Sequence, residues 1–394
     1  MGIALTGEAL LRVRMRALGL DGALAADSVA HGDASGADRA HAVVDHLFAL
    51  QGQDWRASKW AIGARAPGTT AADVTAALNS GRIVRSWPMR GTVHLVPAED
   101  IGWMQRLTNP RVLAGAPKRR AFLGMSDAVL EHTTDVSLAA LAGGTSLDRA
   151  ELGQVWTDAG IDWKPNWRYH LIWWLCQNGL TTFGPVPAVA GGASEPEPRL
   201  VLASEWITAP RSLDGDDALA EFAYRYVRGR GAVSRKDLAS WAMLPAATAA
   251  RGLGLAVERG SIAEARRAGV AGTAGALWVD PAALAASEAA ADSYDGDEWR
   301  LLPAFDEHVL GYSDRSPQFD AAHLGELVPG KNGVFLPTVV HRGRAVGTWR
   351  RDPKSHAVTV SAFAGEHVDL TALTSEFGRW AAFTGRDVPE LKLR

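Results

Sequence analysis

The sequence has 394 residues, of which 47% are hydrophobic and 22% are charged, so it is long enough to bury the cores of two to four globular domains. Its single cysteine, Cys176, excludes an intramolecular disulfide, a cysteine-ligated iron-sulfur cluster and a zinc finger, and it fits a reducing compartment. No segment approaches the length that crosses a bilayer, and the start lacks a basic region followed by an apolar core. We therefore expect a cytoplasmic protein that is neither exported nor inserted in a membrane.

Basic residues are unevenly distributed along a chain whose net charge is −3. Eight Lys and Arg residues lie between Arg82 and Arg120 against two acidic residues, and a second basic group runs from Arg342 to Lys354. Such asymmetry is typical of a protein with one phosphate-facing side. The alternative is that both groups are ordinary solvated faces.

The first predicted unit covers residues 1–120 and includes a short polar motif. Thr6 is expected to cap an opening helix, and a second helix follows over Ala40–Leu50. This spacing places Gln51 in the last helical turn, and Gly52 is expected to end the helix. In extended backbone, residues two apart point to one side, so a break at Gly52 lets Gln51 and Gln53 converge. The alternative is an ordinary solvated helix end.

The rest of this unit is predicted to complete a winged helix. A helix is expected over Trp55–Ala64, and Thr70 with Asp73 resembles a capping box that opens another. Two strand-like runs follow, Ile83–Trp87 and Gly91–Val96. Paired helices followed by a two-stranded hairpin indicate a winged helix.

The same pattern returns twice. In residues 121–211 it comprises a helix from Ser146 through Trp156, a helix over Asn166–Asn178 and a strand ending at Phe183. In residues 212–297 the predicted elements are helices over Ala218–Val227 and Pro245–Leu255, a helix capped by Ser234, and strands over Ile262–Arg267 and Gly275–Val279. We therefore predict three tandem winged-helix units.

Residues 298–394 change to a mixed pattern. Strand-like runs over Gly333–Val340 and Ala345–Arg350 flank Arg342-Gly343-Arg344, which predicts a basic hairpin, and Leu370–Phe383 has helical spacing. The predicted fold class is α+β, with three winged helices and a C-terminal α/β-hairpin region.

Four strings in this order resemble the winged-helix DNA glycosylases of the AlkZ and YcaQ family. They are Leu50-Gln51-Gly52-Gln53-Asp54, the run from Arg90 to Val96, the run from Leu301 to Asp306, and Val346-Gly347-Thr348-Trp349-Arg350. The resemblance covers nearly the whole chain. It implies a bacterial enzyme whose tandem winged helices form a concave, positively charged scaffold for DNA. It further implies removal of bulky N7-alkylated purines, with crosslink unhooking and antibiotic self-resistance in some members.

The resemblance also implies the catalytic residues. The family signature is glutamine, an aliphatic residue, and then glutamine or aspartate, so Gln51 and Gln53 are the expected catalytic pair, and Gly52 departs from the pattern. An N7-alkylguanine already carries positive charge and leaves without protonation. Two neutral amides can then stabilise the cationic sugar and hold the attacking water. With no lysine near the motif except Lys59, we expect a monofunctional enzyme.

Five further residues are candidate DNA contacts. They are Arg90, His94, Arg342, Arg344 and Arg350. A structural, hydrogen-bonded role is the alternative for His94. The run Asp306-Glu307-His308 is expected to be structural, because no ligand spacing supports a metal.

The expected partner is double-stranded DNA carrying alkylated purines, on which the enzyme would be nucleoid-associated, with no metal, no cofactor and no obligatory protein partner. The alternative function is that of a non-catalytic winged-helix DNA-binding protein, either a transcription regulator or a damage binder.

Overall fold

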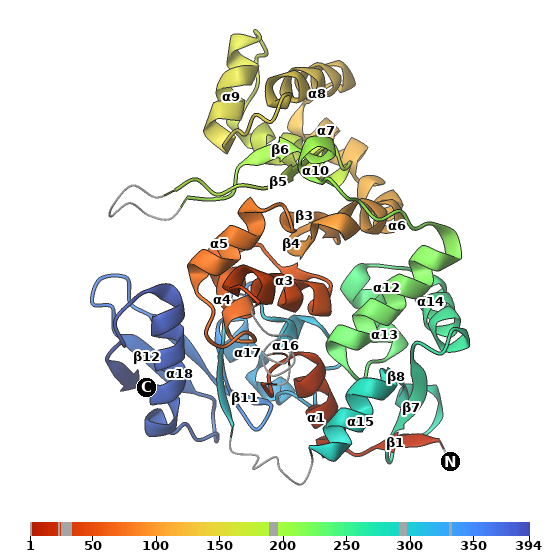
Figure 1. Cartoon of the computed structure of the whole chain (residues 1–394), viewed down its shortest axis with the longest axis vertical. Helices are drawn as coiled ribbons and strands as arrows, with labels where there is room; N and C mark the ends of the chain where they lie inside the picture. The colour runs from red at the N-terminus through yellow and green to blue at the C-terminus, as the bar shows by residue number, and fades with distance from the viewer. Residues whose placement is uncertain (1, 23, 25–33, 189–195, 291–297, 331–332) are drawn as a thin grey trace. The chain divides into compact units, whose positions relative to one another are not determined.

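The computed structural model describes residues 2–22, 24, 34–188, 196–290, 298–330 and 333–394 (Figure 1). The chain divides into two compact units. Unit 1 combines Met1–Val74 with Leu219–Arg394, and unit 2 is Thr75–Ala218. Unit 1 is therefore assembled from both ends of the sequence. The three domain boundaries expected from the sequence remain a prediction, and the one at residue 297 lies outside the described residues.

The N-terminal part of unit 1 is mostly helical. Its elements are β1 (Ile3–Leu5), α1 (Gly7–Ala17), α3 (Gly36–Leu47), β2 (Leu50–Gln51), α4 (Trp55–Gly63) and the start of α5 (Ala71–Asn79). The Oγ1 of Thr6 accepts from the backbone N–H of Ala9 at 3.2 Å, which confirms the predicted cap. The predicted capping box of α5 is also present, since Thr70 and Asp73 bond to each other's backbone N–H groups.

The third predicted winged helix is well defined within unit 1. It comprises α12 (Gly215–Arg230), α13 (Arg235–Ala242), α14 (Ala246–Glu258), β7 (Ala263–Arg267), η3 (Gly272–Gly275) and β8 (Ala276–Val279), and α15 (Pro281–Ala289) follows. The β7 and β8 strands form the expected hairpin. An unpredicted third strand, β1, pairs in parallel with β7 and gives the order β1-β7-β8. The wing therefore includes the start of the chain.

The C-terminal region forms a five-stranded sheet in the order β13-β12-β11-β10-β9. Its elements are β9 (Trp299–Leu302), α16 (Glu307–Leu310), η4 (Ala321–His323), α17 (Leu324–Leu327), β10 (Thr338–His341), β11 (Arg344–Arg351), β12 (Val358–Ala362), α18 (Leu370–Thr384) and β13 (Leu391–Leu393). The ring of Trp349 on β11 packs edge-on against Phe377 and Trp380 of α18. The sheet thus has a core under α18, as the helical spacing there predicted.

Unit 2 carries the predicted β3–β4 hairpin in a sheet with the strand order β4-β3-β5-β6. Its elements are β3 (Ile83–Met89), β4 (Thr92–Pro97), η1 (Ala98–Asp100), α6 (Ile101–Leu113), α7 (Ala116–Leu123), α8 (Asp127–Leu141), α9 (Arg149–Asp158), η2 (Pro165–Trp167), α10 (Arg168–Gln177), β5 (Thr181–Phe183), β6 (Leu200–Leu202) and α11 (Ala203–Trp206). No helix or strand was predicted from the sequence over the range of α6, α7 and α8. The helix predicted from Ser146 begins at Arg149, because Asp148 supplies the cap.

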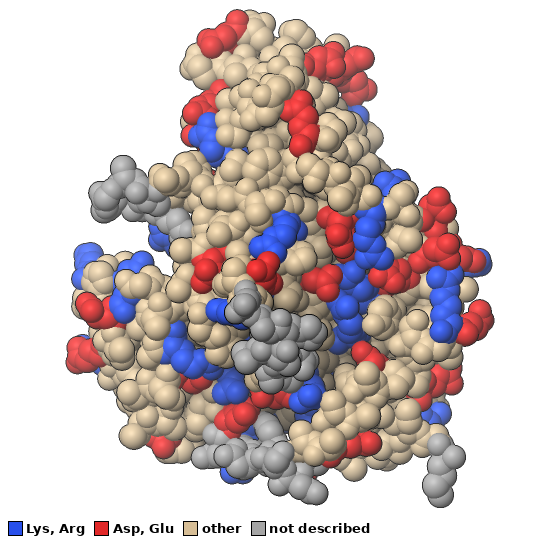
Figure 2. Space-filling model, viewed as in Figure 1, with Lys and Arg blue, Asp and Glu red and all other residues tan. Residues whose placement is uncertain are grey.

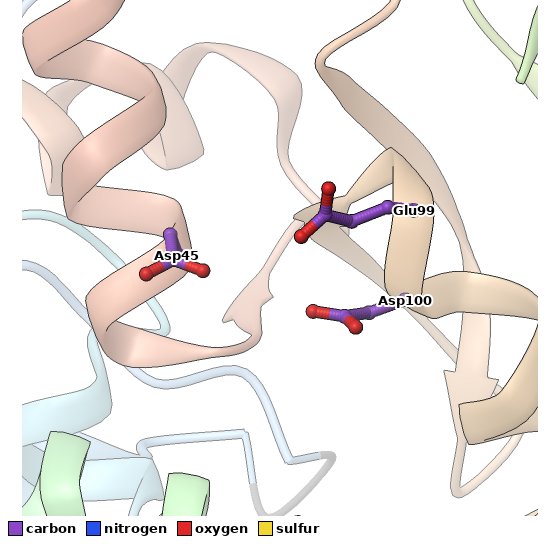
Figure 3. Close-up of side chains that lie close together, drawn as sticks. All are labelled: Asp45, Glu99 and Asp100. Carbon is purple, nitrogen blue, oxygen red and sulfur yellow. The ribbon is translucent and has the colours of Figure 1, made fainter. Parts of the chain in front are cut away.

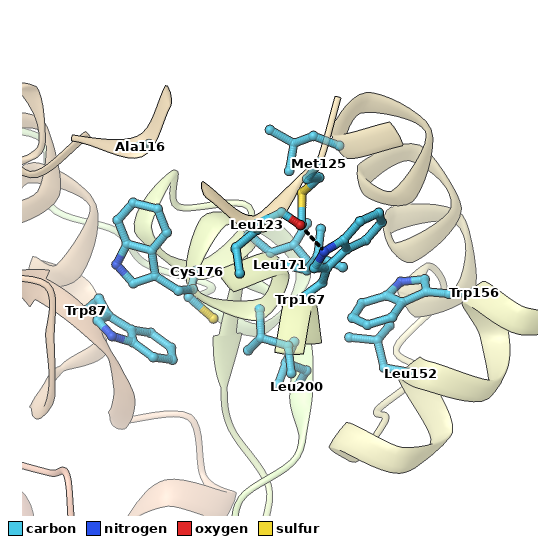
Figure 4. Close-up of a cluster of buried hydrophobic side chains, with 14 of the residues drawn as sticks. Trp87, Ala116, Leu123, Met125, Leu152, Trp156, Trp167, Leu171, Cys176 and Leu200 are labelled. Atoms are coloured by element: carbon cyan, nitrogen blue, oxygen red, sulfur yellow. Dashed lines mark hydrogen bonds between the residues drawn. The ribbon is translucent and has the colours of Figure 1, made fainter. Parts of the chain in front are cut away.

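Tryptophan side chains organise the core of unit 2 (Figure 4). Trp87, Trp156 and Trp167 are all buried. The indole N–H of Trp167 donates to the backbone oxygen of Leu123 at 2.8 Å, and that of Trp156 donates to the Oγ of Ser137 at 2.8 Å. Pairing of the indole N–H groups of Trp156 and Trp167 removes the cost of burying these polar groups, so the two rings act as rigid anchors.

The architecture confirms the predicted α+β fold class. Helices and small sheets alternate in both units, and neither unit is built from one element type. No helix in the described part of the chain is long and apolar enough to cross a membrane.

Candidate active site

The segment before the Gln51-Gly52-Gln53 motif leaves its helix earlier than predicted. Helix α3 ends at Leu47, and Phe48 adopts φ 67° and ψ −45°. The backbone N–H of Ala49 donates to the oxygen of Leu47 at 2.7 Å, which closes a γ-turn around Phe48. The prediction that Gln51 lies in the last helical turn and that Gly52 ends the helix is therefore wrong.

The side chain of Phe48 accounts for this early turn. Its ring is fully buried, meets Phe222 edge-on with ring centroids 5.2 Å apart, and lies 4.9 Å from the guanidinium carbon of Arg225. A positive φ is unfavourable for a bulky residue and persists only where surrounding contacts enforce it. Burial of the ring against α12 supplies those contacts.

The two glutamines lie in a short segment between α3 and α4. Gln51 is the second residue of β2 and is half-buried, Gly52 is buried, and Gln53 is exposed. The carboxylate of Asp54 then caps α4 by accepting from the N–H of Ala57 at 3.0 Å. The motif is thus anchored on both sides by fixed helix ends, and the side chain of Gln53 lies at the surface.

Two buried charged residues, which we call the Arg230/Glu307 clamp, hold the backbone leading into the motif. Arg230 on α12 donates through Nη1 to the oxygen of Leu47 at 2.6 Å and through Nη2 to that of Ala49 at 2.8 Å. The same Nη2 pairs with the Oε2 of Glu307 at 2.7 Å. The other carboxylate oxygen of Glu307 accepts from the backbone N–H of Gln51 at 3.2 Å.

The clamp satisfies polar groups that the γ-turn leaves without helical partners. Arg230 and Glu307 are both fully buried, and the indole N–H of Trp241 donates to the Oε2 of Glu307 at 3.0 Å. A buried ion pair is stable only when further hydrogen bonds satisfy its remaining groups. Here such bonds join Arg230 to the oxygens of Leu47 and Ala49 and join the N–H of Gln51 to Glu307, and they offset part of the cost of burying the pair.

Arg230 was not predicted as a site residue, because no motif near it in the sequence marks a functional site. Glu307 was noticed in the run Asp306-Glu307-His308, and the structural role expected for that run is consistent with its contacts. Asp306 forms a two-pronged ion pair with the buried Arg65, each bond 2.8 Å long. His308 donates from Nε2 to the oxygen of Gly343 at 2.8 Å.

Burial changes the protonation of these groups. Desolvation lowers the pKa of His308 to about 4 and that of His46 to about 4, so both rings are neutral near pH 7. Burial opposes ionisation of Asp306, but the Arg65 guanidinium outweighs it and lowers the pKa of that carboxyl. The site therefore combines the ionised carboxylate of Asp306 with uncharged imidazoles.

The buried histidines predict acid sensitivity. An unfolded histidine titrates near 6.5, so from about pH 6.5 down to 4 the unfolded chain binds protons that folded His46 and His308 do not. The free energy of unfolding should fall as the pH falls, by about 2 kcal/mol per pH unit for the two together. Urea titrations at successive pH values measure this slope. A His308→Gln variant should show about half of it, and stability that stays constant across this window would contradict the assignment.

The predicted basic hairpin is present at β10–β11. Its turn consists of Arg342, with φ 51°, and Gly343, with φ 75°. A Cβ placed on Gly343 would lie 2.9 Å from the side chain of Leu11, so the turn packs against α1 and does not project freely. Arg342 and Arg350 are exposed, whereas Arg344 is half-buried and donates to the oxygen of Pro317 at 3.2 Å. Exposure therefore favours Arg342 and Arg350 as the DNA contacts of this hairpin.

Arg90 and His94 belong to the β3–β4 hairpin of unit 2. His94 is fully buried, accepts at Nε2 from Arg90 at 3.1 Å, and donates from Nδ1 to the oxygen of Thr92 at 2.9 Å. Both ring nitrogens thus have partners in the hairpin, and this favours the structural alternative for His94. Arg90 has a φ of 56° and remains half-buried.

Acidic and basic residues alternate on the face shown in Figure 2, with neither sign forming a continuous coat. Three carboxylates appear in Figure 3, Asp45 on α3 of unit 1 and Glu99 and Asp100 in η1 of unit 2. In unit 1, Asp45 pairs with Arg225 at 2.7 Å, and in unit 2, Asp100 pairs with Arg211 at 2.9 Å. The half-buried Asp45 and the buried Asp100 are thereby neutralised within their own units.

Comparisons with known proteins point to one enzyme class. A family model described as "DNA glycosylase AlkZ-like" matches residues 44–383. Among solved structures, the Streptomyces sahachiroi DNA glycosylase AlkZ is similar, with a TM-score of 0.74 and 18% identity over 100% of both chains. At this identity the structural similarity establishes the fold alone. The search of curated proteins returned no match.

Proposed function

The chain belongs to the AlkZ-like family of DNA glycosylases, and from that premise we propose that it hydrolyses the N-glycosidic bond of N7-alkylated purines in duplex DNA. The family match supports a DNA-repair enzyme over the non-catalytic DNA-binding protein that the sequence left as an alternative. The observation that carries the proposed chemistry is the pair Gln51 and Gln53, which lies on a fixed segment inside the matched range.

The proposed reaction suits neutral amides. In an N7-alkylguanosine the base is cationic, so when the C1′–N9 bond breaks, its electron pair neutralises the leaving base. The sugar passes through an oxocarbenium-like state, and water adds to C1′ and releases a proton to solvent. The products are a neutral N7-alkylguanine and an abasic site. No group on the protein has to donate a proton to the base.

We assign Gln51 and Gln53 to stabilising this cationic sugar and positioning the water. An amide oxygen carries partial negative charge and accepts hydrogen bonds, but it is too weak a base to abstract a proton from water. The pair therefore lowers the barrier only where the leaving group is already activated. We therefore expect no release of undamaged guanine. The reason is that its neutral base is a poor leaving group, not that the base fails to fit the site.

The segment's geometry supports this role. Glu307 accepts from the backbone N–H of Gln51, so the clamp fixes the position of the residue through its backbone. Gln53 is exposed and can reach a ligand. Gly52, where the family signature has an aliphatic residue, is buried between them, so the departure from the signature lies at a position turned away from solvent.

We also assign Arg342 and Arg350 to contacts with DNA phosphates. Both are exposed on the β10–β11 hairpin and carry permanent charge. We further propose that bulky adducts and interstrand crosslinks are accepted, and that the enzyme acts on nucleoid DNA in the cytoplasm, in base excision repair or in self-resistance to a DNA-alkylating product.

A substrate series tests the proposed chemistry. The purified protein should release N7-methylguanine and a bulky N7-guanine adduct from duplex DNA, measured by chromatography of the freed base. It should release no guanine from the same undamaged duplex, because only the N7-alkylated base leaves as a neutral molecule. An O6-methylguanine duplex is the matched control, since that adduct is uncharged. Equal release from the O6-methylated duplex, or none from either N7 adduct, would contradict the proposal.

A further inference from the structure

Helix α7 of unit 2 presents an aromatic ring among cations. Phe122 is 78% exposed, more than any other large hydrophobic residue that the structure describes. The guanidinium carbon of Arg119 lies 5.1 Å from the centre of its ring, and Lys118 beside it is also exposed. An exposed ring beside cations offers a ligand an apolar contact next to positive charge.

The helix that carries this ring is firmly seated. Ala116 and Leu123 on its opposite face are buried in the tryptophan-rich core, where the indole of Trp167 bonds to the backbone of Leu123. Arg120 lies over the ring of Trp174 at 5.2 Å and pairs with Asp127 at 3.0 Å. Phe122 is therefore held outward by an ordered helix.

The positive charges of Lys118 and Arg119 are not balanced by carboxylates that the structure describes. Within the described residues, neither Lys118 nor Arg119 forms an ion pair with a carboxylate, and the Nε2 of His170 has no hydrogen-bond partner although that residue is only 5% exposed. Burial, followed by the charges of Arg120 and Arg119, lowers the pKa of His170 to about 4, so its ring is neutral near pH 7 and adds no positive charge. An anion at this position would relieve an excess of positive charge.

We propose that Lys118, Arg119 and Phe122 form a further DNA-binding surface, through which unit 2 binds double-stranded DNA. Lys118 and Arg119 bind successive phosphates, and Phe122 packs against deoxyribose and base edges in the groove. Charge decides in favour of DNA over a protein partner, because the exposed side chains of α7 include no acid. The inference rests on the enzyme acting on DNA, but not on which base it removes.

Binding of a fluorescein-labelled, undamaged duplex tests the surface without any base release. A Lys118→Ala, Arg119→Ala variant should bind about tenfold more weakly at moderate salt, and the slope of log affinity against log NaCl should become shallower by about 1.8, or 0.9 for each phosphate contact. The matched control is Arg386→Ala, Lys392→Ala, which removes two exposed charges from unit 1 and should leave affinity and slope close to wild type.

Phe122→Ala separates the aromatic contact from the ionic ones. It should weaken binding about fivefold with no change in slope, because no counterion is released by an uncharged ring. All three variants alter exposed side chains, so their melting temperatures should match wild type. A double variant whose slope equals that of the control would overturn the proposal and leave α7 as a protein-docking surface. Unchanged affinity in Phe122→Ala would overturn the role of the ring.

Discussion

Replacing Arg230 by methionine is expected to lower the free energy of unfolding by about 3–5 kcal/mol, because Glu307 then stays buried as an unpaired charge. The loss also leaves the carbonyl oxygens of Leu47 and Ala49 without donors at the strained turn of Phe48. Chemical denaturation measures the first effect. Base release by the protein that remains folded should slow as well, since the backbone that sets Gln51 is no longer fixed.

Glu307→Gln tests the clamp more specifically than Arg230→Met does, since it keeps the shape of the side chain. Both oxygens of Glu307 face donors, namely the N–H groups of Gln51, Arg230 and Trp241. A glutamine amide must point its NH2 at one of them, whichever way it is turned. We expect a slower single-turnover rate of base release with DNA affinity near wild type, because only the chemistry depends on where Gln51 lies.

Glu376→Gln is the matched control for the clamp. Glu376 is another buried acid of unit 1, and it accepts from Arg379 at 2.6 Å without touching the motif. The Glu376→Gln variant should have a lower melting temperature but an unchanged rate of base release per folded molecule. If Glu376→Gln and Glu307→Gln slow the reaction equally, the clamp has no specific part in positioning Gln51.

Features encoded by adjacent residues were predictable from the sequence. The caps at Thr6 and Thr70 and the hairpin around Arg342 depend on residues only a few positions apart, and all three are present. The end of α3 was not predictable, because the apolar spacing up to Leu50 continues past the true end. The early turn depends on Arg230, which is 183 residues from Leu47. Strand β1 was missed for the same reason, since its partner is the distant β7.

The candidate site, too, was only partly predictable from the sequence. Gln51 and Gln53 were identified through a resemblance between motifs, whereas local chemistry alone left a solvated helix end open. Arg230 carries no local signal, and its function exists only because the fold brings α12 beside the turn at Phe48. For His94, burial reveals hydrogen bonds on both ring nitrogens that its place in a strand could not predict.

The Gln51→Ala, Gln53→Ala variant carries the largest expected effect on activity. Two amide oxygens are lost from the position where positive charge develops, and removal of one such preorganised group typically costs about 10²–10³ in rate. The fold should survive, because Gln51 contacts the clamp through its backbone N–H, which alanine retains. Gln154→Ala removes an exposed glutamine on α9 and serves as the matched control.

Single-turnover release of N7-methylguanine from duplex DNA, with enzyme in excess, tests the central claim most directly. We expect the Gln51→Ala, Gln53→Ala variant to bind the duplex and melt like wild type but to release the base at least about 10²-fold more slowly, and we expect Gln154→Ala to keep the wild-type rate. Release by the double variant at the wild-type rate would contradict the assignment of these two residues to catalysis.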